Sequence, residues 1–554
     1  MDKTNVRELQ DVVIRFSGDS GDGMQLTGTL FSDTSALLGN GISTFPDYPA
    51  EIRAPQGTVA GVSGFQVHFG SHRELNPGDY CDVLVAMNPA ALKANRKWLK
   101  PGATVIIDGD SITEDHLKKA CFATLDPIAE LKLDEYNVVI PGITTMTRDA
   151  LRETGLDNKS VTKCKNMFAL GICFYLFDRP EAYAFKYIET KFAKKNPAIA
   201  EANKLAIQAG YNYAANTHQF ANTYTVAPAP LEKGTYRSIS GNVATAWGLC
   251  AAAEKAGLPL FCGSYPITPA TVILEELAKR KDLGVKTVQA EDEIAGICTA
   301  IGAAFAGNFA VTTTSGPGLS LKSEALGLAV MTELPLVVVD VQRGGPSTGL
   351  PTKTEQSDLA QALYGRNGEC PVIVVAASSP SDCFHYAFEA GRLAMEHMTP
   401  VILLTDGFIA NGSEPWRIPA MKDYPAITPP IVDEAPEGGF MPYVRNENLA
   451  RGWAFPGKTG LEHRVGGLEK DCVKGCISHD PSNHQKMVRT RAEKVAKAVD
   501  DIPAQAVWGA PEGDLLVVGW GGTRGHLQNA VDQMRAEGKR VSLCHFNYIN
   551  PLPH

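Results

Sequence analysis

The sequence lacks the features that mark membrane and secreted proteins. No stretch approaches the roughly 18 uninterrupted apolar residues of a membrane-spanning helix, and the apolar run at 334–341 has the length of a strand. The first residues are mixed and charged, without the apolar centre of a secretory signal. The 12 cysteines are scattered over 554 residues and form no disulfide framework. We therefore expect a protein of the reducing cytoplasm with no membrane partner.

Concentrated positive charge is also absent. The formal net charge is −9, and no long block of consecutive Lys and Arg occurs. Nucleic acids and anionic membranes are bound by clustered basic residues, so neither is expected as a main partner. Gly18, Gly21 and Gly23 do not have the G-x-G-x-x-G spacing of a dinucleotide fold, which argues against NAD.

The length exceeds the roughly 250–300 residues at which single cores stop growing, which favours several domains. In the first, residues 1–195, an apolar run at 12–14 leads into a glycine-rich turn at 17–23 and a helical pattern. Val83–Met87 and Thr104–Asp108 are later strand candidates. Alternating strands and helices predict a mostly parallel α/β sheet.

The rest of the chain divides by composition. Residues 196–239 are expected to be a linker, because their second half is polar, contains proline and has no periodicity. Residues 240–420 alternate strands and helices, and open parallel sheets bind ligands at the loops after their strands. A connecting segment at 421–510 precedes a strand–turn–helix–strand at 511–554. Two strands are too few for an independent sheet, so this last piece is expected to be incomplete or completed by a partner.

The segment 263–270 lies where a strand meets a helix. Two prolines flank Ile267 and Thr268, and Pro269 stands at or near the first helical position. This holds the Thr268 hydroxyl near free helix N–H groups, which suits an anion. Alternatively, Thr268 only caps the helix.

Two further loops carry candidate groups. In the turn at 313–318, the N–H groups around Ser315 and Gly316 can face a ligand, although such turns often only reverse the chain. Three acids at 291–293 open an apolar helix and suit its macrodipole. Glu293 abuts the Gly- and Ala-lined part of that helix, so its carboxylate is a candidate for burial with a specific partner.

Arg343 follows the apolar strand at 334–341 and precedes two glycines. A guanidinium at the end of a buried strand needs an anionic partner, and its planar fork binds carboxylates with two hydrogen bonds. A structural salt bridge to Asp or Glu is the alternative.

Together these segments resemble one family. YPITPA, EDEIAGICTAIGAAFAG, TTTSGPGLSLKSEALGLAV and QRGGPSTGLPTKTEQSDL are similar to the pyrimidine-binding domain of 2-oxoacid:ferredoxin oxidoreductases. The likeness continues through HRVGGLEKD and GCISHDPSNHQKMVRTRAEKV. The first domain resembles the family's gamma domain fused ahead of alpha, as in 2-oxoglutarate enzymes. The resemblance thus implies a gamma-type domain at 1–195, a pyrimidine-binding domain at 240–420, and the start of a Rossmann-like, transketolase-C-like domain at 511–554.

The resemblance also implies a divided active site. In such enzymes thiamine diphosphate lies between two chains, and the aminopyrimidine enters the domain present here. A beta subunit carries the diphosphate, Mg²⁺ and the [4Fe-4S] cluster. The expected reaction is the oxidation of 2-oxoglutarate with coenzyme A and ferredoxin, by an alpha₂beta₂ assembly.

Residue roles follow from the resemblance alone. Glu293 aligns with the glutamate bonded to pyrimidine N1′, with Glu291 as the fallback. Arg343 matches the arginine that holds the 1-carboxylate of the substrate, and Thr268 matches the hydroxyl that contacts it. Tyr265, which supports the loop by packing, and Pro266, Ser315 and Gly316 are expected with Thr268 to line the cofactor. Lys353 or Arg366 could offer charge to a distal carboxylate, or either could be a solvated surface residue.

Pieces expected on the beta subunit are missing here. Cys472 and Cys476, with His479 nearby, lack the two-residue spacing of cluster ligands. The diphosphate motif, Gly-Asp-Gly followed by Asn-Asn, is also missing: no asparagine stands at the required distance from residues 21–23, and the segment from 109 departs at two positions. The family's gamma-domain Arg-Gly-Gly is replaced by the segment 51–57, so the glycine turn is expected only to face a cofactor.

Two alternatives remain. The same chemistry could act on pyruvate or a branched 2-oxoacid, since the group that binds the distal carboxylate decides the substrate. The chain could instead be a non-catalytic scaffold, in which case changes at Arg343 and Glu293 would leave activity intact.

Overall fold

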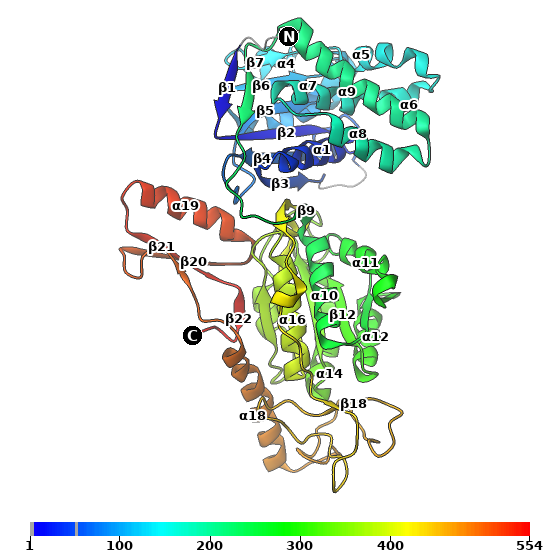
Figure 1. The fold of residues 1–554 in the computed structure, drawn as a ribbon, viewed down its shortest axis with the longest axis vertical. Helices are drawn as coiled ribbons and strands as arrows, with labels where there is room; N and C mark the ends of the chain where they lie inside the picture. The colour runs from blue at the N-terminus through cyan, green and yellow to red at the C-terminus, as the bar shows by residue number, and fades with distance from the viewer. Residues whose placement is uncertain (1–4, 50–53) are drawn as a thin grey trace. The chain divides into compact units, whose positions relative to one another are not determined.

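A computed structural model describes residues 5–49 and 54–554 of the chain (Figure 1). The chain divides into two compact units. The first comprises residues up to 238 together with 413–417, and the second comprises 239–412 and 418–554. The short strand β9 (Tyr236–Ser240) contains the boundary in sequence, and β16 (Ser413–Arg417) is the returning piece of the first unit.

The first unit is built on a six-stranded sheet in the order β3-β4-β2-β5-β6-β7. The strands β2, β5, β6 and β7 run parallel, while β4 is antiparallel to β2 and β3. The mostly parallel α/β sheet expected from the sequence is therefore present. Its strands are β2 (Asp11–Asp19), β3 (Gly41–Asp47), β4 (Val62–Gly70), β5 (Cys81–Ala86), β6 (Leu99–Ile107) and β7 (Asn137–Val139).

Helices surround this sheet, and a pair of parallel strands, β1 (Val6–Leu9) and β8 (Thr223–Val226), lies outside it. The glycine turn leads from β2 into α1, as the sequence predicts. The helices are α1 (Met24–Leu37), α2 (Pro89–Asn95), α3 (Glu114–Lys119), α4 (Pro127–Glu130), α5 (Ile143–Ala150), α6 (Asn158–Thr162), α7 (Lys165–Leu176), α8 (Ala182–Ile188) and α9 (Pro197–Thr217).

The segment 196–239, expected to be a linker, differs from that expectation. Its first half is the 21-residue helix α9, and β8 follows. The helix packs so closely on α7 that a β-carbon at Gly210 would lie only 1.9 Å from the carbonyl oxygen of Phe168. Ala206 and Ile207 of α9 are fully buried. The alanine-rich, half-buried sequence of α9 ends at Thr217, and the polar sequence is confined to residues 218–239. The expected linker therefore begins too early in the chain.

The second unit contains a seven-stranded sheet in the order β11-β10-β12-β13-β15-β14-β22. All its strands are parallel except β22, which runs antiparallel to β14. The strands are β10 (Leu260–Ser264), β11 (Lys286–Gln289), β12 (Phe309–Thr314), β13 (Leu336–Gln342), β14 (Ile373–Ala376), β15 (Pro400–Asp406) and β22 (Tyr548–Asn550).

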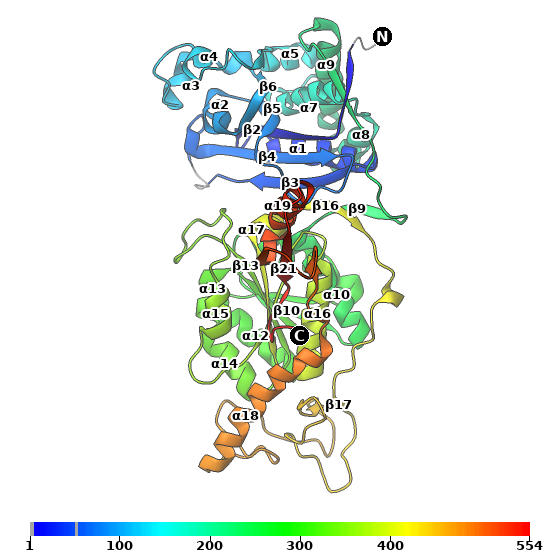
Figure 2. The same ribbon diagram turned by 90° about the vertical axis from the view of Figure 1, so that its left-hand side faces the viewer.

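Helices cover both faces of this sheet, with α10 and α16 on one side and α12 and α14 on the other (Figure 2). The helices are α10 (Gly241–Ala256), α11 (Thr271–Ala278), α12 (Glu293–Phe305), α13 (Gly316–Leu321), α14 (Ser323–Thr332), α15 (Leu359–Tyr364), α16 (Cys383–His397) and α17 (Gly407–Asn411). Strands buried on both faces read as continuous apolar runs, which is why β13 and β15 are so apolar in sequence.

The remainder of the second unit is largely irregular up to α18, the helix expected in the connecting segment. The final strand–helix–strand is present as β20, α19 and β21, but β19 adds a third strand to this small sheet and β22 joins the larger one. The elements are β17 (Ile431–Val432), β18 (Trp453–Ala454), α18 (Pro481–Lys497), β19 (Val507–Trp508), β20 (Leu515–Trp520), α19 (Arg524–Ala536) and β21 (Val541–Phe546). None of the helices in the described ranges is long and apolar enough to cross a membrane.

Candidate functional site

Four loops of the second unit meet at one edge of the seven-stranded sheet. The strands β11, β10, β12 and β13 are parallel neighbours, so their carboxyl ends lie side by side. In open α/β sheets this edge is where ligands bind. The loops singled out in the sequence of this unit, at 263–270, 291–293, 313–318 and from Arg343, follow these four strands.

Glu293 is the first residue of α12, after β11. The preceding Asp292 caps the helix, because its carboxylate accepts a 2.7 Å hydrogen bond from the Ala295 N–H. This cap leaves Glu293 free for another role, and its side chain is buried, with 8% exposure. The fallback candidate Glu291 is exposed. Burial therefore favours Glu293 over Glu291 as the functional acid.

The turn between β12 and α13 lies against Glu293. Ser315 is completely buried, and its hydroxyl has no hydrogen-bond partner among the described residues. Gly318 is required for the side chain of Glu293 to fit, since a β-carbon there would lie 2.8 Å from its Cγ and 2.0 Å from Thr314 Oγ1. The turn therefore packs directly against Glu293, in addition to reversing the chain.

Arg343 follows β13 and is almost completely buried, with 6% exposure. Its Nη1 donates to the Thr268 carbonyl at 2.7 Å, its Nη2 donates to the Thr348 carbonyl at 3.2 Å, and its Nε has no partner among the described residues. Burial lowers the pKa of the guanidinium, and the facing carboxylates of Glu293 and Asp358 oppose this shift. No described carboxylate forms an ion pair with Arg343, so the alternative of a structural salt bridge is not realised.

The loop after β10 contains the other candidates. The hydroxyl of buried Ser264 donates a 2.7 Å hydrogen bond to the Thr313 carbonyl, which ties this loop to β12. Helix α11 begins at Thr271 with no side-chain cap, so the interpretation of Thr268 as a helix cap is wrong. Thr268 is exposed and its hydroxyl is not engaged by the helix. Tyr265 is 38% exposed and Pro266 is half-buried.

The two candidates for a distal carboxylate differ. Lys353 is half-buried, and its main-chain oxygen accepts a 2.9 Å hydrogen bond from Gly344, which closes the loop that starts at Arg343. The guanidinium of Arg366 donates to main-chain carbonyls of its own neighbourhood, including Ala362 and Leu363 at 2.9 and 2.8 Å. Arg366 therefore acts as a local structural group, and its proposed role at a distal carboxylate is not supported.

A buried pair of acids was missed in the sequence. Asp340 lies within β13 with no exposure, and Asp358 lies at the start of α15, with its carboxylate 2.7 Å from where a β-carbon of Gly316 would stand. Burial raises the pKa of Asp340 well above its ordinary value, and the neighbouring charge of Asp358 raises it further. Adjacent carboxylates repel one another when both are ionised, so the half-buried Asp358 favours the protonated form of Asp340. The sequence does contain a sign of this pair, because Asp340 is the one charged residue in the apolar run at 334–341.

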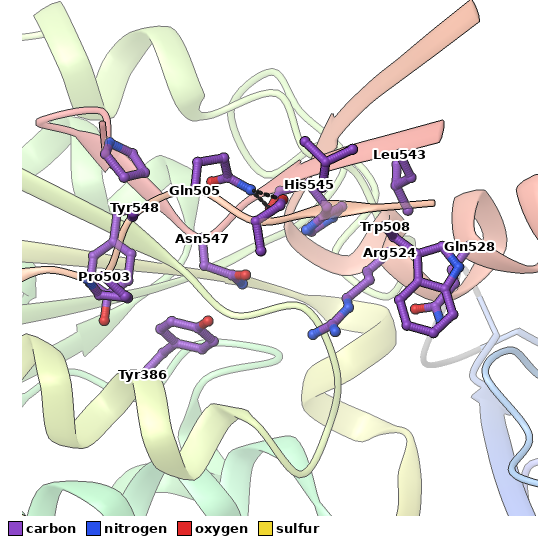
Figure 3. Close-up of a pocket in the computed structure, with 14 residues that line it drawn as sticks. Tyr386, Pro503, Gln505, Trp508, Arg524, Gln528, Leu543, His545, Asn547 and Tyr548 are labelled. Carbon is purple, nitrogen blue, oxygen red and sulfur yellow. Dashed lines mark hydrogen bonds between the residues drawn. The ribbon is translucent and has the colours of Figure 1, made fainter. Parts of the chain in front are cut away.

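A separate cavity of about 340 Å³ lies between α16 and the final strands of the second unit. Figure 3 shows Tyr386, Arg524, His545 and Asn547 around it. Burial and the charge of Arg524 lower the pKa of His545 to about 4. None of the residues singled out in the sequence lines this cavity.

The glycine turn of the first unit borders a cavity of about 800 Å³, lined by Asp19, Gly21 and Asp22. Lys165 of α7 pairs with Asp22 at 2.9 Å and also lines the cavity. The turn thus faces an open space, and the expectation that it faces a cofactor stays a prediction. Of the neighbouring segment 51–57, residues 51–53 lie outside the described part of the chain. No group of three or more His, Cys, Asp or Glu side chains within 5–49 and 54–554 is arranged to hold a metal ion.

Known proteins match both units. The family model described as pyruvate flavodoxin/ferredoxin oxidoreductase, thiamine diP-binding, matches residues 252–477, and the one described as pyruvate ferredoxin/flavodoxin oxidoreductase matches residues 13–213. The chain is 53% identical to 2-oxoglutarate oxidoreductase subunit KorA of Mycobacterium tuberculosis, over 99% of this chain and 83% of that protein. The chain belongs to the 2-oxoacid:ferredoxin oxidoreductase family.

Other members of the 2-oxoacid:ferredoxin oxidoreductase family extend the match. The alpha subunit of 2-oxoacid:ferredoxin oxidoreductase 1 from Aeropyrum pernix is 28% identical over 98% of this chain and 88% of its own. The solved structure of 2-oxoglutarate:ferredoxin oxidoreductase from Magnetococcus marinus, with 2-oxoglutarate, coenzyme A and succinyl-CoA bound, superposes with a TM-score of 0.84 at 32% identity. That match covers 98% of this chain and 89% of that one. The family resemblance inferred from the sequence is therefore confirmed, as is the assignment of the chain to an alpha-type subunit.

Proposed function

We propose that the chain is the alpha subunit of a 2-oxoglutarate:ferredoxin oxidoreductase. Together with a beta subunit, it interconverts 2-oxoglutarate, coenzyme A and oxidised ferredoxin with succinyl-CoA, CO₂ and reduced ferredoxin. The names of the M. tuberculosis and M. marinus relatives support the substrate. The observation that carries the proposal is that Glu293 and Arg343 are both buried at one edge of the sheet, close enough for their opposite charges to interact.

The residues at this edge fit an aminopyrimidine. The Ser315 hydroxyl is buried without a partner, and Glu293 opens α12 with a buried carboxylate. Buried polar groups are normally hydrogen-bonded, so both are suited to a ligand with donors and acceptors. Bound thiamine diphosphate supplies a carbanion for attack on the 2-oxoacid and an electron sink for its decarboxylation. Glu293 would hold a proton at the pyrimidine N1′, with Tyr265, Pro266, Ser315 and Gly316 lining the ring.

Arg343 and Thr268 would hold the substrate. A guanidinium has five N–H donors, and Arg343 uses two of its groups on main-chain carbonyls, so Nε and further protons remain for a carboxylate. Because the arginine is almost completely buried, a charge-assisted hydrogen bond there is strong. The exposed Thr268 hydroxyl lies on the loop whose carbonyl orients Arg343. Lys353 is proposed for the distal carboxylate.

The partner supplies the rest of the active site in this proposal. The diphosphate, Mg²⁺ and the [4Fe-4S] cluster would lie on a beta subunit in an alpha₂beta₂ assembly, and ferredoxin would take the electrons. Residues 511–554 are proposed to belong to a Rossmann-like, transketolase-C-like domain. The strand–helix–strand β20-α19-β21, with its parallel pairing of β20 and β21, supports this.

The test is to co-produce the chain with its beta subunit and measure CO₂ release coupled to reduction of a low-potential dye. We expect 2-oxoglutarate to be turned over better than pyruvate or a branched 2-oxoacid. Equal rates with pyruvate would contradict the substrate assignment. Full activity of both Glu293→Gln and Arg343→Ala complexes would instead identify the chain as a scaffold.

A further inference from the structure

Lys322 is a completely buried lysine beneath the proposed cofactor site. It lies between α13 and α14, directly after the turn that contains Ser315 and Gly318, and it has no solvent exposure. Its ammonium donates a 2.7 Å hydrogen bond to the main-chain carbonyl oxygen of Glu293. Moving an ammonium out of water is costly, so a buried lysine needs partners that compensate for its lost hydration.

The groups around Lys322 identify Glu293 as its partner. Besides the Glu293 carboxylate, the ammonium faces the carboxylate of Asp292 and the thiols of Cys262 and Cys298. Burial raises the pKa of both thiols, that of Cys262 to about 12, so they are uncharged at neutral pH. Asp292 is exposed and already caps α12. Glu293 is therefore the buried group that receives both a hydrogen bond and the charge of Lys322.

We propose that Lys322 is a positioning residue for Glu293. Lys322 binds the main-chain carbonyl of Glu293 and so fixes the first residue of α12. The Glu293 side chain is thereby held in its position beside Gly318. Lys322 thus connects the turn at the start of α13 with Glu293. This inference rests on the proposed function, because it gives Glu293 the task of binding the cofactor. Lys322 touches neither cofactor nor substrate in this scheme and acts only through Glu293.

A second buried lysine provides a matched control. Lys470 is 2% exposed, and its ammonium donates a 2.8 Å hydrogen bond to the main-chain carbonyl of Met331. Burial lowers the pKa of Lys322 and of Lys470 alike, to about 8 in each case. The charged neighbours of Lys470 do not include Glu293. Replacing either lysine by methionine removes one ammonium and one hydrogen bond to a carbonyl, and fills the space with an apolar chain.

The experiment compares Lys322→Met with Lys470→Met in the complex with the beta subunit, freed of cofactor. Thiamine diphosphate is titrated in while protein fluorescence is followed. We expect the dissociation constant to rise roughly tenfold in Lys322→Met, the scale of one lost charge-assisted hydrogen bond, and to be unchanged in Lys470→Met. At saturating cofactor, kcat should fall in Lys322→Met while KM for the 2-oxoacid stays within about twofold, since Arg343 is untouched.

A double-mutant comparison separates positioning from a general structural role. In a Glu293→Gln background, Lys322→Met should weaken cofactor binding by no further factor, because the carboxylate that Lys322 positions is already absent. Unchanged cofactor affinity in Lys322→Met, or equal weakening in Lys470→Met, would overturn the inference. If Lys322→Met does not assemble, the same comparison is made with Lys322→Gln and Lys470→Gln. Normal cofactor binding and turnover in Glu293→Gln would instead refute the role of Glu293 in the proposed function.

Discussion

The Nη1 of Arg343 donates a 2.7 Å hydrogen bond to the carbonyl oxygen of Thr268, 75 residues earlier in the chain. This bond connects the loop after β13 with the loop after β10, two strands separated in the sheet by β12. The buried guanidinium is thereby held by the backbone of the loop that presents the Thr268 hydroxyl. Arg343 and the loop of Thr268, which are proposed to hold the substrate, are thus fixed relative to one another.

Replacement of Arg343 should act on substrate binding. We expect Arg343→Ala to raise KM for the 2-oxoacid by roughly 10- to 100-fold, since hydrogen bonds to charged groups contribute about 1.5–3 kcal/mol. Arg343→Lys should recover only part of this, because an ammonium cannot serve the Thr268 carbonyl, the Thr348 carbonyl and a carboxylate with one planar fork. Steady-state kinetics of the complex measure both effects. Arg366→Ala is the control, because its guanidinium binds local carbonyls and its loss should leave KM unchanged.

Gly318 offers a way to disturb Glu293 without changing a polar group. A methyl group at 318 would lie 2.0 Å from Oγ1 of Thr314 and 2.8 Å from Cγ of Glu293. Gly318→Ala should therefore displace both side chains and lower kcat by at least tenfold, the scale of a misplaced group in the site. Gly327→Ala is the matched control, because a β-carbon there meets nothing within 4 Å and alanine favours the helix. Equal kcat values for the two variants would contradict the proposed place of Glu293.

Much of this site could be predicted from the sequence because its signals are local. Apolar runs ending in turn residues marked the strands, and parallel strands that alternate with helices must present their carboxyl ends together. Asp292 before an apolar helix is a local capping pattern, and the structure realises it. The positions of the loops that carry Glu293 and Arg343, at the ends of their strands, then followed, whereas the order of the strands in the sheet was not predicted.

The features that were missed depend on distant parts of the chain. Whether Thr268 caps α11 or orients Arg343 is decided by a partner 75 residues away. The raised pKa of Asp340 depends in part on Asp358, which lies beside it only because the start of α15 returns to β13. Helix α9 lies within the expected linker because its alanines are buried by packing on other helices, chiefly α7. Local composition cannot show such contacts, which exist only after the chain has folded.

Glu333 is expected to stabilise the fold and to take no part in catalysis. It is 1% exposed, both its oxygens bond to Arg445 at 2.6 Å, and Lys494 donates to it at 2.6 Å. Burial works to raise the pKa of Glu333, yet Lys494 and Arg445 hold it below its ordinary value. Its stabilising charge is therefore present above the pKa of the unfolded chain and is lost only in acid.

We expect Glu333→Gln to cost about 3–5 kcal/mol at neutral pH, because it leaves two buried cations without their anion. The urea midpoint of the second unit measures this. Glu437→Gln, an exposed position in the connecting segment, should leave the midpoint unchanged. A loss in Glu333→Gln no larger than in that control would show that the buried cations are compensated in another way.

Asp406 predicts a pH dependence of the opposite kind. It ends β15 and caps α17, accepting hydrogen bonds from the N–H groups of Phe408 and Ile409 at 2.9 and 3.1 Å. Burial raises the pKa of its carboxyl group to about 6. Between pH 4 and 6 the folded chain therefore holds a proton that the unfolded chain has released. Stability from this group is fully present in acid and is lost as the pH rises through 6.

The loss should amount to about 3 kcal/mol, since each pKa unit corresponds to about 1.4 kcal/mol. Asp406→Asn cannot titrate, and its side-chain oxygen can still accept from the helix start. We therefore expect the urea midpoint of the wild type to fall relative to Asp406→Asn when the pH is raised from 4.5 to 7.5. Unfolding curves of both proteins at the two pH values decide this. A difference between them that is independent of pH would mean that Asp406 remains ionised in the folded chain throughout that range. The N–H groups of Phe408, Ile409 and Gly522 would then outweigh the effect of its burial.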